Sequence, residues 1–484
     1  MAEKFLELKN ASVQSAGTKI LDDVSFLVNR NEQWAIIGPS GSGKTLLANV
    51  IAGKIFHSGE INYHFPIKNN NKSSILVVDQ QHRFKNLSNT NDLYYQQRFN
   101  SSDAEQTINV LQEIQEHFPD KDFFDDEWLE VLHIQELLEK PLIQLSNGEN
   151  KRVQLVIALL ENPSLLILDN PFIGLDVKMR KTLHEIIQKI SQKGIHILLI
   201  ASHNEIPDSI THIANLEKGS LIFAGEKEKF LQQKHQNKET QKLDLKLLHE
   251  LKTGQDNDFS FVIKMRSVNI KYGDRQILHD INWEVKQGER WNLSGPNGAG
   301  KSTLLSLVTA DNPQAYANEI YLFDKRRGSG ESIWDIKQKI GFVSPELHIF
   351  FDYTATCFEV IASGLFDTIG LFRQLNDQQT ARVFLWLKLF QLENLRTKRL
   401  SQISVSEQRK TLLARALIKT PPLLILDEPC QGLDDEQTEY FKNLIDEICL
   451  AFNSTLVYVS HYKNQIPDCV NHFLHLENGK IINS

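Results

Sequence analysis

The residues with the most evident chemistry form a glycine-rich loop that begins at Gly295 and ends in Lys301 and Ser302. This spacing is that of a P-loop, in which glycines let successive backbone N–H groups face phosphate oxygens. The lysine supplies positive charge to the β- and γ-phosphates, and the hydroxyl is a ligand for Mg²⁺. A strand-like stretch precedes the loop and a helix-like stretch follows it. We therefore predict nucleotide binding by Gly295, Pro296, Asn297, Gly298, Ala299, Gly300, Lys301, Ser302 and Thr303.

The loop occurs twice, and so do the features around it. Lys44 lies 257 positions before Lys301, and the aspartates that end two apolar runs, Asp169 and Asp427, are 258 positions apart. A nearly constant shift over several features indicates a tandem duplication. The first copy's predicted nucleotide-binding residues are Gly38, Pro39, Ser40, Gly41, Ser42, Gly43, Lys44 and Thr45.

Bulk composition limits the classes of function. A chain of 484 residues with 41% apolar and 24% charged residues is expected to form more than one soluble globular domain. Its net charge of −8 gives no reason to expect nucleic-acid binding. Apolar runs are too short to span a bilayer, and the N-terminus lacks the pattern of a secretory signal. The four cysteines show no C-x-x-C spacing, so we expect reduced thiols in a cytoplasmic protein.

The elements that must position the loops alternate between strand and helix. Short apolar runs flanked by turns, such as 165–168 and 423–426, are typical of buried parallel strands. Each copy opens with alternating strands, and the middle parts 88–140 and 351–399 have helical patterns. Alternation of strand and helix predicts an α/β fold with a parallel sheet, in which the nucleotide lies at the carboxyl ends of the strands. We predict domains at 1–230 and 259–484, joined by a short helical linker at 231–258 that rests on a domain.

Carboxylates at the ends of the apolar runs complete the predicted chemistry. Asp169 and Asp427 are expected to hold Mg²⁺, together with the hydroxyls of Thr45 and Ser302. The residue that follows should handle the attacking water. Glu428 can act as a general base, whereas Asn170 can orient water but cannot accept its proton. His203 and His461 each follow an apolar strand and a serine, which favours a phosphate-sensing role over a purely structural one.

A further pair of motifs resembles one family, the ATP-binding cassette (ABC) ATPases, over both halves of the chain. The stretch 145–149 is similar to the LSGGQ signature, in which Ser146 and Gly148 would cap the γ-phosphate of ATP bound to the opposite domain. A serine hydroxyl and a helix N-terminus form an anion site. The second copy keeps Ser404 but has Val405 and Ser406 in place of the glycines, which predicts a poorer cap. The resemblance also implies that each domain has an antiparallel β subdomain and a helical subdomain.

Other positions carried over from the family are equally asymmetric. The adenine-stacking aromatic matches Tyr272 in the second copy, whereas the same position in the first copy is Ser15. The Q-loop glutamine, a ligand of Mg²⁺ or water, matches Gln80 in the first copy and falls on Pro345 in the second. Since the family pairs its two domains head to tail, Asn170 and the altered signature at 404–406 fall on one nucleotide. We expect one hydrolytic site with Glu428 and His461 as catalytic residues, and one site that holds ATP.

The stretch 304–336 resembles the ModF (PhrA) type of tandem ABC ATPases, which are associated with molybdate transport. The resemblance implies that separate membrane permease subunits are partners and that the protein lies at the inner face of the membrane. The alternative is an ABC ATPase without a transport role, such as a translation or repair factor. The arginine-rich segment 326–331 is open to two interpretations, an anion or partner contact and a solvated basic turn.

Overall fold

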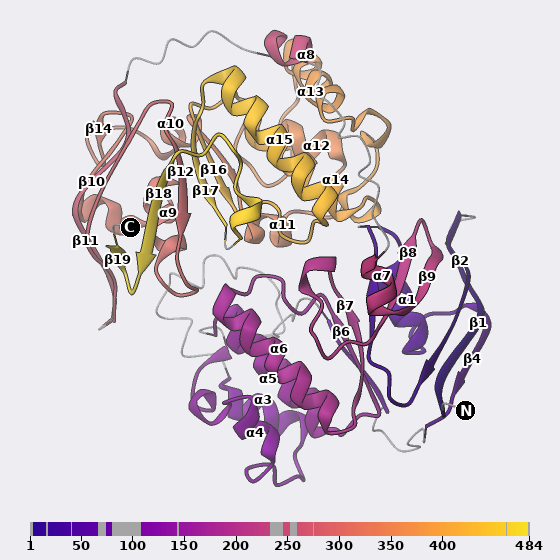
Figure 1. Ribbon diagram of the computed structural model, residues 1–484. Helices are drawn as coiled ribbons and strands as arrows, with labels where there is room; N and C mark the ends of the chain where they lie inside the picture. The colour runs from indigo at the N-terminus through magenta and orange to yellow at the C-terminus, as the bar shows by residue number, and fades with distance from the viewer. Residues whose placement is uncertain are drawn as a thin grey trace. The chain divides into compact units, whose positions relative to one another are not determined.

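The computed structural model shows two compact units, Met1–Asn237 and Lys238–Ser484 (Figure 1). The boundary between them falls inside the predicted linker 231–258. The structure describes residues 3–15, 18–39, 41–65, 74–79, 108–142, 145–232, 245–251, 259–273, 275–460 and 462–482.

The first unit is built on a six-stranded sheet with the strand order β5-β6-β7-β3-β8-β9. All neighbouring strands in it are parallel except the last pair, β8 and β9, which is antiparallel. Its strands are β3 (Trp34–Ile37), β5 (Ile75–Val78), β6 (Leu165–Asp169), β7 (His196–Ile200), β8 (His212–Glu217) and β9 (Ser220–Glu226). A separate antiparallel sheet, with the order β2-β1-β4, consists of β1 (Lys4–Ser15), β2 (Thr18–Asn29) and β4 (Ser58–Tyr63).

Helices cover both faces of this central sheet, because successive side chains of a strand point to opposite faces. In β6, Leu166 and Leu168 belong to one core cluster, whereas Leu165 and Ile167 belong to the other. The first cluster also contains residues of the helical part, and the second contains residues of α1 and the antiparallel sheet. The helices are α1 (Lys44–Ile51), α3 (Val110–His117), α4 (Glu127–Val131), α5 (Asn147–Leu160), α6 (Val177–Gln192) and α7 (Lys227–Gln232), with the 3₁₀ turns η2 (Gln135–Leu137) and η4 (His203–Glu205).

The second unit repeats this topology. Its six-stranded sheet has the order β15-β16-β17-β12-β18-β19 and consists of β12 (Arg290–Ser294), β15 (Ile340–Val343), β16 (Leu423–Asp427), β17 (Thr455–Val459), β18 (His472–Glu477) and β19 (Lys480–Ile482). The antiparallel sheet has the order β11-β10-β13-β14 and consists of β10 (Phe261–Tyr272), β11 (Arg275–Lys286), β13 (Glu319–Leu322) and β14 (Lys325–Arg326). The parallel sheets with their helices confirm the α/β fold predicted from the alternation of strand and helix, and the antiparallel sheets are those that the family resemblance implied.

The helices of the second unit include a short one from the predicted linker. They are α8 (Leu245–Glu250), α9 (Lys301–Val308), α10 (Ile333–Lys337), α11 (Pro345–Phe350), α12 (Cys357–Ser363), α13 (Asp377–Leu389), α14 (Val405–Leu417) and α15 (Asp435–Phe452), with the 3₁₀ turns η5 (Pro313–Ala317), η6 (Glu393–Leu395), η7 (Leu400–Gln402) and η8 (Lys463–Gln465). Leu247 and Leu251, predicted to share a helical face, are buried in the core cluster that contains α13 and α15. The end of the linker therefore packs on the second unit. None of the helices in the described parts of the chain combines the length and hydropathy needed to cross a bilayer.

Candidate nucleotide-binding sites

Both glycine-rich loops have the backbone that a phosphate cradle requires. Gly38 and Gly295 have φ values of 139° and 143°, and a Cβ at either would lie 2.0 Å from a carbonyl oxygen of the neighbouring strand. Helices α1 and α9 start directly after Gly43 and Gly300, which are left-handed. Glycine is therefore needed both for conformation and for the close approach of the loop to the sheet. Ser40 lies outside the described residues.

The loop lysines bond to their own loops. Nζ of Lys44 donates to the carbonyl oxygens of Gly38 and Pro39 at 2.7 and 2.8 Å. Nζ of Lys301 makes the same bonds to Gly295 and Pro296, at 2.7 and 2.9 Å. Each ammonium thus lies over its loop, where phosphate oxygens can replace the carbonyl oxygens as acceptors.

The predicted Mg²⁺ ligands of the first unit are in contact with each other. Oγ1 of Thr45 donates to Oδ2 of Asp169 at 2.8 Å, which joins the start of α1 to the end of β6. Burial raises the pKa of Asp169 above its usual value, and the hydrogen bonds from Thr45 and Asn170 act in the opposite direction. A hydroxyl and a carboxylate are hard oxygen donors that suit Mg²⁺. In the second unit, Ser302 and Asp427 occupy the same positions at the starts and ends of α9 and β16.

The residues after these aspartates share an unusual backbone. Asn170 and Glu428 both have a φ of 45°, in the left-handed region. Their N–H groups donate to the ends of the next strands, at Ile200 and Val459, both at 2.9 Å. Asparagine tolerates this conformation better than glutamate does. The glutamate is thus held in a strained conformation, as is common at functional sites.

The side chain of Asn170 is engaged with its neighbour. Nδ2 of Asn170 donates to Oδ1 of Asp169 at 2.7 Å. A glutamate at this position could not donate that bond at neutral pH. The amide therefore acts on the aspartate of its own strand, and one of its donors is not directed to a water molecule.

The two signature-like helices have the same N-terminal capping. Ser146 caps α5 by accepting from the N–H of Glu149, whose carboxylate accepts from the N–H of Ser146 at 2.8 Å. Ser404 and Glu407 make the same capping box on α14, with the return bond at 2.7 Å. The glutamate at the family's glutamine position thus stabilises the helix start. Val405 and Ser406 leave this backbone arrangement intact.

The two signatures differ in the packing of one position. A Cβ at Gly148 would lie 2.7 Å from Cγ of Met179 at the start of α6. The second copy has Ser406 at this position, and Gln437 at the position of Met179. Gln437 folds back on its own helix, where Oε1 accepts from the N–H of Asp434 at 3.3 Å. Glycine and methionine in one copy therefore correspond to serine and a retracted glutamine in the other.

Tyr272, the predicted adenine-stacking residue, is fixed by a neighbouring segment. Nδ2 of Asn312 donates to the hydroxyl of Tyr272 at 2.9 Å and to Oγ of Ser306 at 3.2 Å. Asn312 is buried, and it lies in the stretch that resembles the ModF type. Part of this stretch thus positions the tyrosine. The side chain of Ser15 in the first copy is outside the described residues.

Of the remaining predicted site residues, the structure describes His203 and Pro345. The ring of His203 packs on Phe230 of α7, with centroids 5.4 Å apart. His461 and Gln80 lie outside the described residues. Pro345 is the first residue of α11, which Ser344 caps, so the second unit begins a helix directly after β15.

The two arginines in the arginine-rich turn of the second unit have different surroundings. Arg327 is buried; its Nη1 donates to Oε1 of Glu331 at 2.9 Å, and its guanidinium lies 4.8 Å from the ring centroid of Tyr316. Glu331 also accepts from the N–H groups of Gly328 and Ser329. Arg327 thus holds the turn together, whereas Arg326 is exposed.

Sequence reasoning missed a buried cation on each signature helix. Lys151 and Arg409 are 7% and 3% exposed. Nζ of Lys151 donates to the carbonyl oxygen of Asp79 at 2.9 Å, and Nη2 of Arg409 lies 3.5 Å from Oε1 of Gln431. The available signal was their constant spacing of 258 positions, which placed a cation at the same helix position in both copies.

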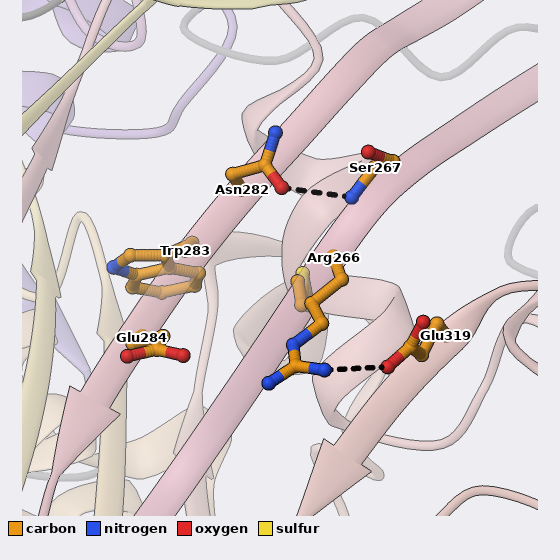
Figure 2. Close-up of a pocket in the computed structure, with 7 residues that line it drawn as sticks. Arg266, Ser267, Asn282, Trp283, Glu284 and Glu319 are labelled. Carbon is orange, nitrogen blue, oxygen red and sulfur yellow. Dashed lines mark hydrogen bonds and ion pairs between the residues drawn. The ribbon is translucent and has the colours of Figure 1, made fainter.

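The hollow on the antiparallel sheet of the second unit is separate from these residues. It has a volume of about 540 Å³ and is lined by Met265, Arg266, Ser267, Asn282, Trp283, Glu284 and Glu319. Figure 2 shows that its polar groups bond to each other: Arg266 to Glu319 at 3.3 Å, and the N–H of Ser267 to Asn282 at 2.9 Å. No predicted nucleotide-binding residue lines it.

These loops, strand-ending aspartates and capped helices on a repeated parallel sheet define a tandem P-loop nucleotide-binding protein. The family model described as ABC transporter matches residues 21–173 and 278–431. The chain therefore belongs to the ABC transporter family as an ATP-binding protein with two tandem domains, and it is an ATPase.

Proteins of similar length share this organisation. The chain is 34% identical to the ABC transporter ATP-binding protein ModF of Escherichia coli, over 97% of this chain and 96% of ModF. It is 33% identical to an uncharacterized ABC transporter ATP-binding protein of Schizosaccharomyces pombe, over 99% of both chains. A solved structure titled RNase-L Inhibitor matches 98% of this chain and 90% of its own with a TM-score of 0.55, at 17% identity. That structural likeness supports the fold only.

Proposed function

We propose that the protein hydrolyses ATP at one site and holds ATP without turnover at the other. The observation that carries the proposal is the pair Asn170 and Glu428, which have the same left-handed backbone in the same place but different side-chain chemistry. Only the glutamate can remove a proton from an attacking water. The amide of Asn170 also donates a hydrogen bond to Asp169, the last residue of β6.

Head-to-tail pairing of the domains, which the family resemblance implies, would form two composite sites. Site two comprises Tyr272, Lys301, Ser302, Asp427, Glu428 and His461 with the cap of Ser146 and Gly148. Site one comprises Lys44, Thr45, Gln80, Asp169, Asn170 and His203 with the cap of Ser404. Site one thus combines the missing base with the altered signature, although the two changes come from different halves of the chain.

In site two the loop N–H groups and Lys301 bind the phosphates, Tyr272 stacks on adenine, and Glu428 accepts the proton of the attacking water. Ser302 and Asp427 are the residues that would hold Mg²⁺, as Thr45 and Asp169 would in site one. When bound, the ion neutralises charge on the β- and γ-phosphates. His461 would contact the γ-phosphate end.

Matched substitutions in the full chain test the asymmetry. We expect E428Q to lower the ATPase kcat by about 10²- to 10⁴-fold, because general-base help is lost. N170A should change kcat by less than about threefold, since no base is removed. K44A should keep measurable ATPase, whereas K301A should abolish it. Equal losses from N170A and E428Q would contradict the proposal.

The cellular role we propose is to energise a transporter through separate membrane permease subunits, with the protein at the cytoplasmic face of the membrane. The likeness to the ABC transporter ATP-binding protein ModF supports this role, and the resemblance of the stretch 304–336 to the ModF type implies cargo related to molybdate. The alternative is an ABC ATPase that acts without a permease, as a translation or repair factor. A pull-down with ATP-trapped E428Q distinguishes the two: recovery of a permease supports transport, and recovery of ribosomes or DNA supports the alternative.

A further inference from the structure

Arg409 is a buried cation with few partners. It lies on the inner face of α14 and is 3% exposed. Its Nη2 lies 3.5 Å from Oε1 of Gln431, and within the described part of the chain its Nε and Nη1 have no hydrogen-bond partner. Burial lowers the pKa of Arg409 to about 10, so the guanidinium stays charged at neutral pH. A buried charge needs a compensating charge nearby.

The first unit shows where such compensation comes from. At the same helix position, Lys151 donates to the carbonyl oxygen of Asp79, the residue that follows β5. Burial lowers the pKa of Lys151 to about 8, against the opposing charges of Asp169 and Asp79. Lys151 thus has a second carboxylate close by, in addition to the aspartate that ends β6.

In the second unit, the second carboxylate follows a different strand. The residue that follows β15 is Ser344, which is uncharged, whereas Asp79 follows the matching strand β5. Conversely, the residue after Asp427 is Glu428, whereas Asn170 follows Asp169. The charges of Asp169 and Asp79 thus act on Lys151, and the charge of Glu428 acts on Arg409.

We propose that Arg409 is a positioning residue for ATP hydrolysis, which compensates the charge of Glu428 and fixes the turn that carries it. The turn is closed by the N–H of Gln431, which donates to the carbonyl oxygen of Glu428 at 3.1 Å. Arg409 contacts Gln431 from the signature helix and therefore ties α14 to this turn. Because Glu428 has a left-handed backbone, it depends on its surroundings to keep its position.

Steady-state ATPase measurements on the full chain test this role, which rests on the proposed function of Glu428. R409Q should lower kcat by about 10- to 100-fold, because a displaced base loses alignment. The KM for ATP should change by less than about threefold, because Arg409 is buried on α14 and is not one of the predicted nucleotide-binding residues. R409K, which keeps the charge, should recover part of the lost kcat. A loss confined to KM, or no rescue by lysine, would overturn the role.

The matched control is Arg415, a second buried arginine on α14. Its Nε donates to Oγ of Ser363 and its Nη2 to the carbonyl oxygen of Thr368, so it faces the helical part of the unit. R415Q should lower the Tm but leave the kcat of the folded protein within about twofold. If R415Q and R409Q lower kcat equally, Arg409 is merely structural and the inference fails.

A double-variant cycle of thermal stability tests the inference without measuring turnover. R409Q and E428Q should each lower the Tm, because each removes one charge of the pair, and the double variant should lose less than the sum. Additive changes in Tm would contradict charge compensation. If E428Q keeps full ATPase activity but the cycle is non-additive, the proposed function fails and the pairing stands. If E428Q abolishes turnover and R409Q leaves kcat unchanged, only the present inference fails.

Discussion

Asn170 donates through Nδ2 to Oδ1 of Asp169 at 2.7 Å, while Thr45 donates to the other carboxylate oxygen at 2.8 Å. Both oxygens of this buried aspartate thus have a protein donor in the first unit. The carboxylate has a fixed orientation toward the start of α1, where the P-loop ends. Asn170 supplies an amide donor to this carboxylate and no base that could accept a proton from water.

The contact between Gly148 and Met179 predicts a second-site rescue. G148S should destabilise the first unit by about 1–3 kcal/mol, because the added atoms overlap the methionine side chain. The double variant G148S/M179Q should regain most of the lost stability, because the second copy already combines Ser406 with Gln437. Urea unfolding of both variants checks the prediction. A double variant no more stable than G148S would show that the methionine is not the obstacle.

The ring and the hydroxyl of Tyr272 should contribute differently to ATP binding, because the hydroxyl is bonded to Asn312. Y272A should weaken ATP binding at site two about tenfold, the size of a lost aromatic stack. Y272F keeps the ring and should bind ATP within about threefold of the unchanged chain. Calorimetric ATP titration of both variants in the E428Q background measures these affinities. The binding signal that is lost in K301A is the one that belongs to site two. Equal losses in the two variants would contradict stacking.

Burial of His348 predicts a loss of stability in mild acid. Burial, with the nearby charge of Arg409, lowers the pKa of His348 from 6.5 to about 4, and its Nε2 lies 2.5 Å from Oε1 of Gln408. Between these values the unfolded chain binds a proton that the folded chain does not. The contribution of neutral His348 to the free energy of unfolding should therefore be complete above pH 6.5. It should fall by up to about 3 kcal/mol as the pH is lowered toward 4.

Urea unfolding at a series of pH values measures this loss. H348Q, which keeps a polar group but cannot titrate in this range, should show a weaker pH dependence of the second unit's transition. The same slope in H348Q and in the unchanged chain would show that other groups cause the acid sensitivity.

Adjacent arginines in the second unit should behave differently. R327A should lower the free energy of unfolding by about 3 kcal/mol, because it removes a buried guanidinium and leaves the partly buried Glu331 without its charged partner. R326A should change it by less than about 0.5 kcal/mol, because Arg326 is exposed. Thermal melts of the two variants provide the comparison. If both lower the Tm equally, the turn rather than the ion pair is responsible.

The sequence by itself determined the repeat, the two loops and the parallel α/β fold. These depend on short-range patterns: glycines before a lysine, apolar runs that end in aspartate, and a constant shift between copies. The asymmetry between Asn170 and Glu428 was also readable, because it is a difference of residue type at a matched position. Such features are local, so no tertiary contact is needed to recognise them.

Only the tertiary structure decided which side chains act on each other. Lys151 and Arg409 look like surface charges in the sequence, and their burial depends on strands that lie far along the chain. The same holds for Arg327, for the bond between Asn312 and Tyr272, and for the contact of Gly148 with Met179. Burial and hydrogen bonding of polar groups are set by the packing of several elements, and that packing is not encoded in any one short stretch.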